Sequence, residues 1–292
     1  MRILYKGWNI LIAIQRKGDG PIVIQSSGYT SDEKAIREPW IVTQFRTIPH
    51  RDRSKLPDPV IFKNNLPCYK ELDATVLTLY LLPECNSLEE AANELATWYT
   101  NSLKEKVDLK DATFIGHSKG GLLITSALEK IQNPTKACII TPTFGTITGY
   151  EGAMIKKIEE CKRKRKNPFF RLKLDVLKTI IKVICSRRPI DADMQYASVF
   201  VRETAKNIKK LKEHNMALVT AICPTYKCSL QDKIFRNVGQ ILGMNPRKSD
   251  GMVELEQQRV PSPVIKTEYV VHATHPNAIK AAEFAVVAML LK

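Results

Sequence analysis

The sequence has no apolar run long enough to cross a membrane. No stretch approaches the roughly 18 consecutive apolar residues of a membrane span, and the C-terminal run Ala281–Leu291 is interrupted by Glu283. The run Trp8–Ile14 follows Arg2 and Lys6, but it is short for a signal peptide and lacks a small-residue cleavage site. We therefore expect no secretory leader, and we predict that this run is the first strand of a sheet.

Acidic residues are too few to balance the basic ones. The chain has 45 Lys and Arg against 30 Asp and Glu, which gives a net charge of +15. Its seven cysteines are an odd number and are scattered, which is typical of reduced thiols. Cys223 and Cys228 are close enough to pair or to bind a metal ion, but a zinc site needs a second pair of ligands. We expect free thiols and a cytoplasmic location.

Internal repeats, low-complexity linkers and the phosphate-loop spacing GxxxxGK[ST] are also missing. The chain instead has a serine between glycines, in Gly116-His117-Ser118-Lys119-Gly120, where an apolar strand changes to a helix. This is the GxSxG nucleophile elbow, whose sharp turn leaves no room for side chains at the glycine positions. The context favours Ser118 as a nucleophile over a plain tight turn or a phosphate site at a helix N-terminus.

Apolar strands alternate with amphipathic helices along the whole chain. The strands are expected at 9–14, 21–26, 74–81, 112–116, 136–141, 216–222 and 267–272. The helices are expected at 88–107, 119–132 and 276–291. Such alternation predicts an α/β protein with a mainly parallel central sheet and helices on both of its faces. With 44% hydrophobic residues, the 292-residue chain can bury one large core.

Four segments resemble the α/β-hydrolase superfamily, and within it the lipases and esterases with a Gly-His-Ser-x-Gly-Gly elbow. They are Pro21–Tyr29, Cys85–Ala96, the elbow itself and Ile139–Thr146 with its Thr-Pro-x-x-Gly-Thr pattern. The resemblance implies the α/β-hydrolase fold and a serine hydrolase that cleaves carboxylic esters of lipid or other acyl substrates through an acyl-enzyme intermediate, with no metal or organic cofactor. One residue departs from the pattern, because Ser27 stands where these lipases have a histidine.

A serine hydroxyl is a weak nucleophile, so Ser118 needs a base and an acid that orients this base. The expected chain order is Ser, then Asp or Glu, then His. Of the downstream histidines, His272 and His275 follow the last predicted strand, and His275 has the placement of the catalytic histidine in small lipases. We predict His275 as the base and keep His272 as the alternative.

The acid of this triad is predicted to be Asp250. The segment Lys248–Val253 resembles the Ser-Asp-Gly-x-Val loop of lipases, whose aspartate holds the histidine. Asp-Gly also marks ordinary turns, and Glu254, Glu256 and Asp232 are the weaker candidates. Asp250 would accept the Nδ1 proton of His275 and stabilise the imidazolium that forms during acyl transfer.

The tetrahedral intermediate needs an oxyanion hole with two hydrogen-bond donors. One predicted donor is the backbone N–H of Lys119. The other is expected within Ser27, Gly28 and Tyr29, either from a backbone N–H or from the Ser27 hydroxyl.

The resemblance divides the chain into three parts. Residues 1–146 form the first part of the hydrolase core, 147–215 a basic helical cap or lid, and 216–292 the second part of the core with the acid and histidine loops. Within the insert, residues 155–188 hold 13 Lys or Arg against 3 acidic residues, which supplies +10 of the +15 net charge of the chain. A helical apolar face follows the Lys162–Lys166 cluster. Its members are Phe170, Leu174, Leu177, Ile181 and Ile184.

Three interpretations of this insert stay open. Its apolar face packs on the hydrolase core as a cap, or residues 155–188 dock on an anionic membrane surface as in a peripheral membrane protein. The third is a nucleic-acid contact or a nuclear import signal, which is the least favoured because no known nucleic-acid-binding fold accompanies it. Two other functions also stay open for the whole chain. They are an acyltransferase or thioesterase with the same triad, and an inactive hydrolase fold that serves as a binding module.

Overall fold

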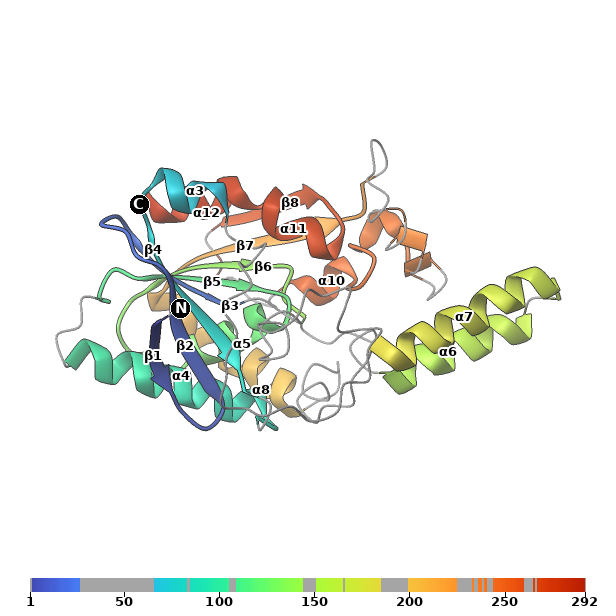
Figure 1. Ribbon diagram of the computed structural model, residues 1–292, viewed down its shortest axis with the longest axis horizontal. Helices are drawn as coiled ribbons and strands as arrows, with labels where there is room; N and C mark the ends of the chain where they lie inside the picture. Colours follow the sequence, from blue (N-terminus) through green and yellow to red (C-terminus); the bar gives the residue numbers. More distant parts are fainter. Residues whose placement is uncertain are drawn as a thin grey trace.

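A mixed, mostly parallel sheet of eight strands forms the centre of the molecule (Figure 1). The computed structural model describes residues 2–26, 66–82, 85–104, 109–143, 151–164, 166–184, 199–224, 244–259 and 267–291, with 233, 236–237, 239–240 and 265. The strands are β1 (Arg2–Lys6), β2 (Ile10–Arg16), β3 (Ile22–Ser26), β4 (Thr75–Leu81), β5 (Thr113–His117), β6 (Lys136–Ile140), β7 (Asn215–Ile222) and β8 (Thr267–His272). Their order is β1-β2-β4-β3-β5-β6-β7-β8. β1, β2 and β4 pair antiparallel, and the pairs from β4 to β8 are parallel.

The strand predicted at 9–14 is confirmed as β2, but a strand that precedes it was missed. The chain begins with β1, which forms an antiparallel hairpin with β2 through a turn closed by the Gly7 N–H donating to the Ile10 carbonyl at 2.9 Å. β1 is an edge strand of five residues, and Ile3 and Leu4 stay 41% exposed. A short, half-exposed edge strand buries too little to produce a distinct apolar pattern. All seven predicted strands, β2 to β8, lie within two residues of their predicted bounds.

Helices cover both faces of the sheet, as predicted (Figure 1). One face carries α4 (Leu88–Lys104), α5 (Lys119–Leu128) and α8 (Val199–Asn207). The opposite face carries α3 (Pro67–Glu71), α11 (Ala278–Ala281) and α12 (Glu283–Leu290). The remaining elements are α6 (Glu151–Lys164), α7 (Pro168–Ile184), α10 (Leu255–Gln258) and the 3-10 helices η3 (Ile208–Glu213), η4 (Pro246–Lys248) and η5 (His275–Asn277). No helix of the described residues is both long and apolar enough to span a membrane.

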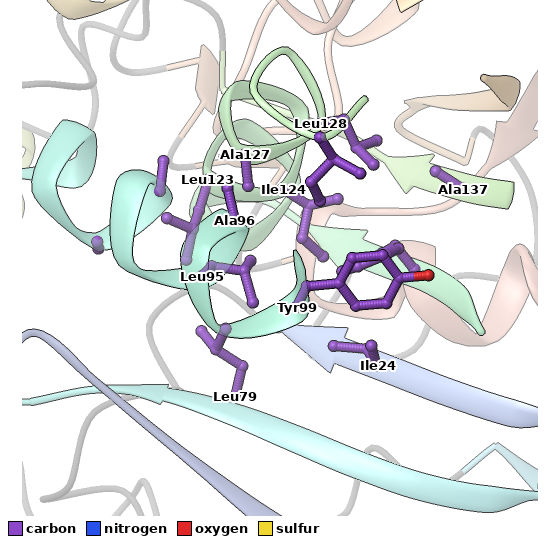
Figure 2. Packing of buried hydrophobic residues seen from close by; sticks show 14 of the residues in the cluster. Ile24, Leu79, Leu95, Ala96, Tyr99, Leu123, Ile124, Ala127, Leu128 and Ala137 are labelled. Carbon is purple, nitrogen blue, oxygen red and sulfur yellow. The ribbon is translucent and has the colours of Figure 1, made fainter. Parts of the chain in front are cut away.

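The two faces of the sheet bury separate apolar clusters, because successive side chains of a strand point to opposite sides. In β3, Val23 belongs to the cluster under α3, α11 and α12, whereas Ile24 belongs to the cluster under α4 and α5. Figure 2 shows the cluster under α4 and α5, in which Tyr99 of α4 and Leu123 of α5 lie on the same side of the sheet as Ile24 of β3. The Tyr99 and Phe114 rings meet edge to face at 5.1 Å. This burial fixes β5 and α5, and with them the turn that carries Ser118.

The predicted helix 276–291 is divided into three pieces. η5, α11 and α12 follow one another, with the break at Ala282 between the last two. Glu283 opens α12, and its Oε1 accepts a hydrogen bond of 2.7 Å from the backbone N–H of Cys68 at the start of α3. The C-terminal segment therefore holds α3 on the sheet through a polar contact as well as through apolar packing.

The predicted insert 147–215 contains α6, α7 and α8. α8 contributes Phe200 and Val201 to the apolar cluster on the face of the sheet that α4 and α5 cover. α6 and α7 pack against each other and project away from the sheet (Figure 1). The described members of the predicted apolar face, Phe170, Leu174 and Leu177, pack against α6. Ile181 and Ile184 are not among the side chains that the structure describes.

Candidate active site

Ser118 lies in a strained turn between β5 and α5. Its φ of 57° and ψ of −127° are a conformation that side-chain-bearing residues rarely adopt. Close packing on both sides holds this turn. A Cβ on Gly116 would lie 2.6 Å from the Gly121 Cα, and a Cβ on Gly120 would lie 2.3 Å from the Ser26 carbonyl oxygen. The glycines of the motif thus let the elbow pass between α5 and the end of β3.

The structure brings His275 to Ser118. The residue lies in η5, directly after β8, and its Nε2 is 2.8 Å from the Ser118 Oγ. The backbone N–H of His275 donates to the Asp250 carbonyl at 2.9 Å, which ties the histidine loop to the acid loop. His275 is 5% exposed, so the pair of side chains is largely shielded from water.

Asp250 completes a continuous chain of hydrogen bonds. Its Oδ2 is 2.6 Å from the His275 Nδ1, and its Oδ1 accepts from the backbone N–H groups of Met252 (2.9 Å) and Val253 (2.8 Å). The side chain is fully buried, so these donors are what replace water around the carboxylate. An ionised carboxylate can only accept, so His275 carries its proton on Nδ1 and presents the Nε2 lone pair to the Ser118 hydroxyl.

The acid loop is held by Gln258, a residue that belongs to no recognised motif of the sequence. Its Nε2 donates to the Ala221 and Val253 carbonyls, and its Oε1 accepts from the Ala221 N–H at 2.7 Å. Gln258 is fully buried in α10. Its role depends on the tertiary fold, since nothing in the sequence separates Gln258 from its neighbour Gln257. Gln258 anchors the Asp250 loop to the end of β7.

The other downstream histidines and the alternative acids lie elsewhere. His272 is exposed at the end of β8, and His214 is buried against Thr135 and the Leu128 carbonyl. Glu254 precedes α10 and Glu256 is exposed within it. Asp232 lies outside the described residues.

His117 packs directly beside this hydrogen-bonded chain. Its ring centroid is 5.0 Å from that of His275, and its Nε2 is 3.0 Å from the His275 carbonyl oxygen. A carbonyl only accepts, so His117 donates from Nε2. The pKa of His117 is lowered to about 3, first by burial and then by the neighbouring His275, while the hydrogen bond to the His275 carbonyl opposes both effects. His117 is therefore a neutral residue that holds the backbone of the histidine loop.

His117 is expected to make the protein sensitive to acid. Because the pKa of His117 is about 3 in the folded protein and about 6.5 in the unfolded chain, the unfolded chain binds more protons between these values. The free energy of unfolding should fall as the pH drops through this window, by about 1.4 kcal/mol per pH unit from this group. Urea unfolding of His117→Asn between pH 7 and pH 5 should show a shallower loss than the wild type.

The exposed His272 provides the control for this measurement. His272→Asn should keep the wild-type pH dependence. Burial also lowers the pKa of His214, so some acid sensitivity remains in the His117 variant. Equal slopes for His117→Asn and the wild type would contradict the assignment.

The predicted oxyanion donors are described only in part. Lys119 is the first residue of α5, directly after Ser118, and is 1% exposed. Ser27, Gly28 and Tyr29 lie outside the described residues. Three buried hydroxyls that the sequence analysis did not single out lie at the carboxyl ends of β3 and β6, and none has a hydrogen-bond partner within the described part of the chain. They belong to Ser26, Thr141 and Thr143. The described residues include no group of three or more His, Cys, Asp or Glu arranged to hold a metal ion.

Neither a protein-family model nor a curated protein sequence matches the chain. Solved structures do match the chain. A lipase of Bacillus licheniformis in its mature form is 11% identical, with 98% of this chain and 99% of that chain covered and a TM-score of 0.52. The propeptide form of the same lipase is 13% identical, with 96% and 53% covered and a TM-score of 0.50.

These matches agree with the strand order and with the helices on both faces of the sheet. The chain has the α/β-hydrolase fold. In this α/β-hydrolase fold, Ser118 follows β5, Asp250 lies between β7 and β8, and His275 follows β8. All three therefore gather at the carboxyl edge of the parallel strands, where open α/β sheets bind their ligands.

Proposed function

We propose that the protein is a serine hydrolase that cleaves carboxylic esters through an acyl-enzyme intermediate. The hydrogen-bonded chain from Ser118 through His275 to Asp250 carries this proposal. Buried serine, imidazole and carboxylate groups occur in many proteins, but this order, at distances of 2.8 and 2.6 Å on a strained elbow, is the arrangement that activates a hydroxyl.

In the first half-reaction, His275 Nε2 takes the hydroxyl proton of Ser118 while Oγ attacks the ester carbonyl carbon. Asp250 stabilises the resulting imidazolium through the Nδ1–H hydrogen bond. The imidazolium then gives its proton to the leaving alcohol, and the acyl group stays on Ser118. In the second half-reaction, His275 takes a proton from water, the hydroxide oxygen attacks the acyl carbon, and Ser118 leaves with the proton.

The tetrahedral intermediate of each half-reaction carries a negative oxygen. The N–H of Lys119 is the donor proposed for this oxyanion from the elbow, where the N-terminus of α5 also favours negative charge. The second donor is proposed within Ser27, Gly28 and Tyr29. Loss of one such donor typically lowers kcat about 100- to 1,000-fold.

The substrate class is an ester of a lipid or another acyl group. The similar solved structure is named a lipase, so esters of fatty acids are the first substrates to test. The 11% identity to that chain supports the shared fold alone, so the acyl chain length and the alcohol have to be measured directly.

Turnover of p-nitrophenyl esters with acyl chains of increasing length tests this proposal. We expect release of p-nitrophenol, and stoichiometric labelling by a fluorophosphonate probe with the adduct on the peptide that contains Ser118. A faster release on addition of an alcohol or thiol, with formation of the new ester, indicates acyl transfer. Protein that is folded but neither labelled nor active would overturn the proposal and leave the binding-module interpretation.

A further inference from the structure

The hairpin of α6 and α7 has an interior of its own. Ile158 of α6 and Leu174 of α7 are fully buried between the two helices. Other apolar side chains close this contact from both sides. They are Ile155, Cys161, Phe170 and Leu177. The hairpin projects from the carboxyl edge of the sheet, with the end of α6 and the start of α7 farthest from it (Figure 1).

Two ion pairs join α6 and α7, and each pairs one acidic side chain of the hairpin with one basic side chain. Asp175 accepts from Lys162, and Glu159 accepts from Lys178, each at 2.5 Å. Five further basic residues at the end of α6, at the start of α7 and in their connection are exposed, and none forms an ion pair within the described residues. They are Arg163, Lys164, Lys166, Arg171 and Lys173. The far end of the hairpin therefore carries an uncompensated positive charge.

A second apolar stripe of α7 faces solvent beside these basic residues. Phe169 is 74% exposed, Leu172 is 60% exposed and Val176 is 53% exposed. Their spacing of three and four places them on one side of the helix. Phe170 and Leu174 lie on a different face of α7, which packs on α6. At 100° per residue, the centre of that face is about a third of a helical turn away from the centre of the exposed stripe. The hairpin does not need this exposed stripe for its own packing.

We propose that the far end of the α6–α7 hairpin docks on the surface of a bilayer that contains anionic phospholipids. Phe169, Leu172 and Val176 enter the boundary between head groups and acyl chains, and the basic residues bind the head-group phosphates and carboxylates. Nucleic acid would account for the positive charge, but it gives no role to the exposed aliphatic side chains of Leu172 and Val176. The docking goes beyond the esterase activity and does not require it.

Co-sedimentation with vesicles tests the docking. Full-length protein is mixed with phosphatidylcholine vesicles with and without phosphatidylserine, both as wild type and as Ser118→Ala, which cannot consume the lipid if the proposed function is right. We expect both proteins to bind the anionic vesicles, to bind pure phosphatidylcholine far more weakly, and to lose affinity as the salt concentration rises. Equal binding of the two proteins keeps this result separate from the outcome for catalysis.

Two variants and their matched controls locate the surface. The triple variant Arg163→Gln, Lys164→Gln, Lys166→Gln should bind about 100-fold more weakly, since each basic residue near an anionic surface contributes about fivefold. Lys70→Gln, Lys110→Gln, Lys212→Gln removes as much charge from exposed positions elsewhere and should bind almost as the wild type does. Phe169→Ser should weaken binding about tenfold, whereas Trp8→Ser, at a residue that is 88% exposed on the β1–β2 turn, should not.

Any of three results would overturn the docking. The protein does not bind the anionic vesicles, it binds neutral vesicles equally well, or the hairpin triple variant and the control triple variant weaken binding to the same extent. Tighter binding to a DNA or RNA duplex, with no effect of Phe169→Ser, assigns the surface to nucleic acid instead. Circular dichroism melts of each variant establish that the chain is folded in every comparison.

Discussion

Replacement of Ser118 by alanine is expected to lower kcat for p-nitrophenyl ester hydrolysis about 10,000-fold or more and to abolish labelling by a fluorophosphonate probe. The change removes the only atom that forms the covalent bond, while the Asp250–His275 pair stays. KM should change little, because the Oγ atom bonds covalently to the acyl group and contributes little to binding. Rates measured with and without enzyme, over a range of substrate concentrations, separate kcat from KM.

The control for this measurement is Ser102→Ala. Ser102 is a buried serine of α4, away from the elbow, and its replacement should leave both labelling and turnover close to those of the wild type. Because Ser118 adopts φ 57°, Ser118→Gly relaxes the turn and serves as a second inactive variant if the alanine destabilises the protein. Full labelling of both Ser118 variants would place the nucleophile elsewhere.

A comparison of His275→Ala with His272→Ala is expected to show the second large effect. His275 is 2.8 Å from the Ser118 Oγ, so its loss leaves the hydroxyl without a base and should lower kcat about 10,000-fold or more. His272 is exposed at the end of β8, and its replacement should leave kcat within about twofold of the wild type, as surface changes usually do. Ester turnover and probe labelling rates measure both.

Stability has to be measured on the same two variants. His275 is buried against His117 and donates its backbone N–H to the loop of Asp250, so a partial loss of activity with a lowered melting temperature would point to loop disorder. His275→Gln keeps most of the side-chain volume without a base and separates the two effects. A large loss of kcat in His272→Ala, with His275→Gln active, would reverse the assignment.

Much of the fold follows from local sequence patterns. Seven strands and the helices α4 and α5 lie close to their predicted bounds, since long apolar runs and amphipathic spacing depend only on neighbouring residues. β1 was missed because its three apolar residues are consecutive, so they neither alternate with polar residues nor form a long run. The division of the C-terminal helix into η5, α11 and α12 was missed as well, because a segment rich in alanine and aliphatic residues favours a single helix on propensity alone.

In the insert, the helical spacing of apolar residues in α7 predicted a buried face but not the element that covers it. The apolar positions 170, 174 and 177 predicted a buried helix face, and Phe170, Leu174 and Leu177 do form one. The periodicity could not say that α6 would cover this face. Nor could it say that Phe169, Leu172 and Val176 would remain exposed on another side, since helical spacing reports which residues share a face but not what lies opposite.

The sequence by itself determined the α/β fold class, the elbow around Ser118 and the order of the candidate acid and base, because each depends on residues close together in the chain. The tertiary structure decided which histidine reaches Ser118. His272 and His275 are three residues apart, yet the end of β8 turns one into solvent and the other toward the Asp250 loop. That choice rests on contacts across 25 and 157 residues of sequence. Only the packing of β5, β7 and β8 in one sheet brings these residues within hydrogen-bond distance.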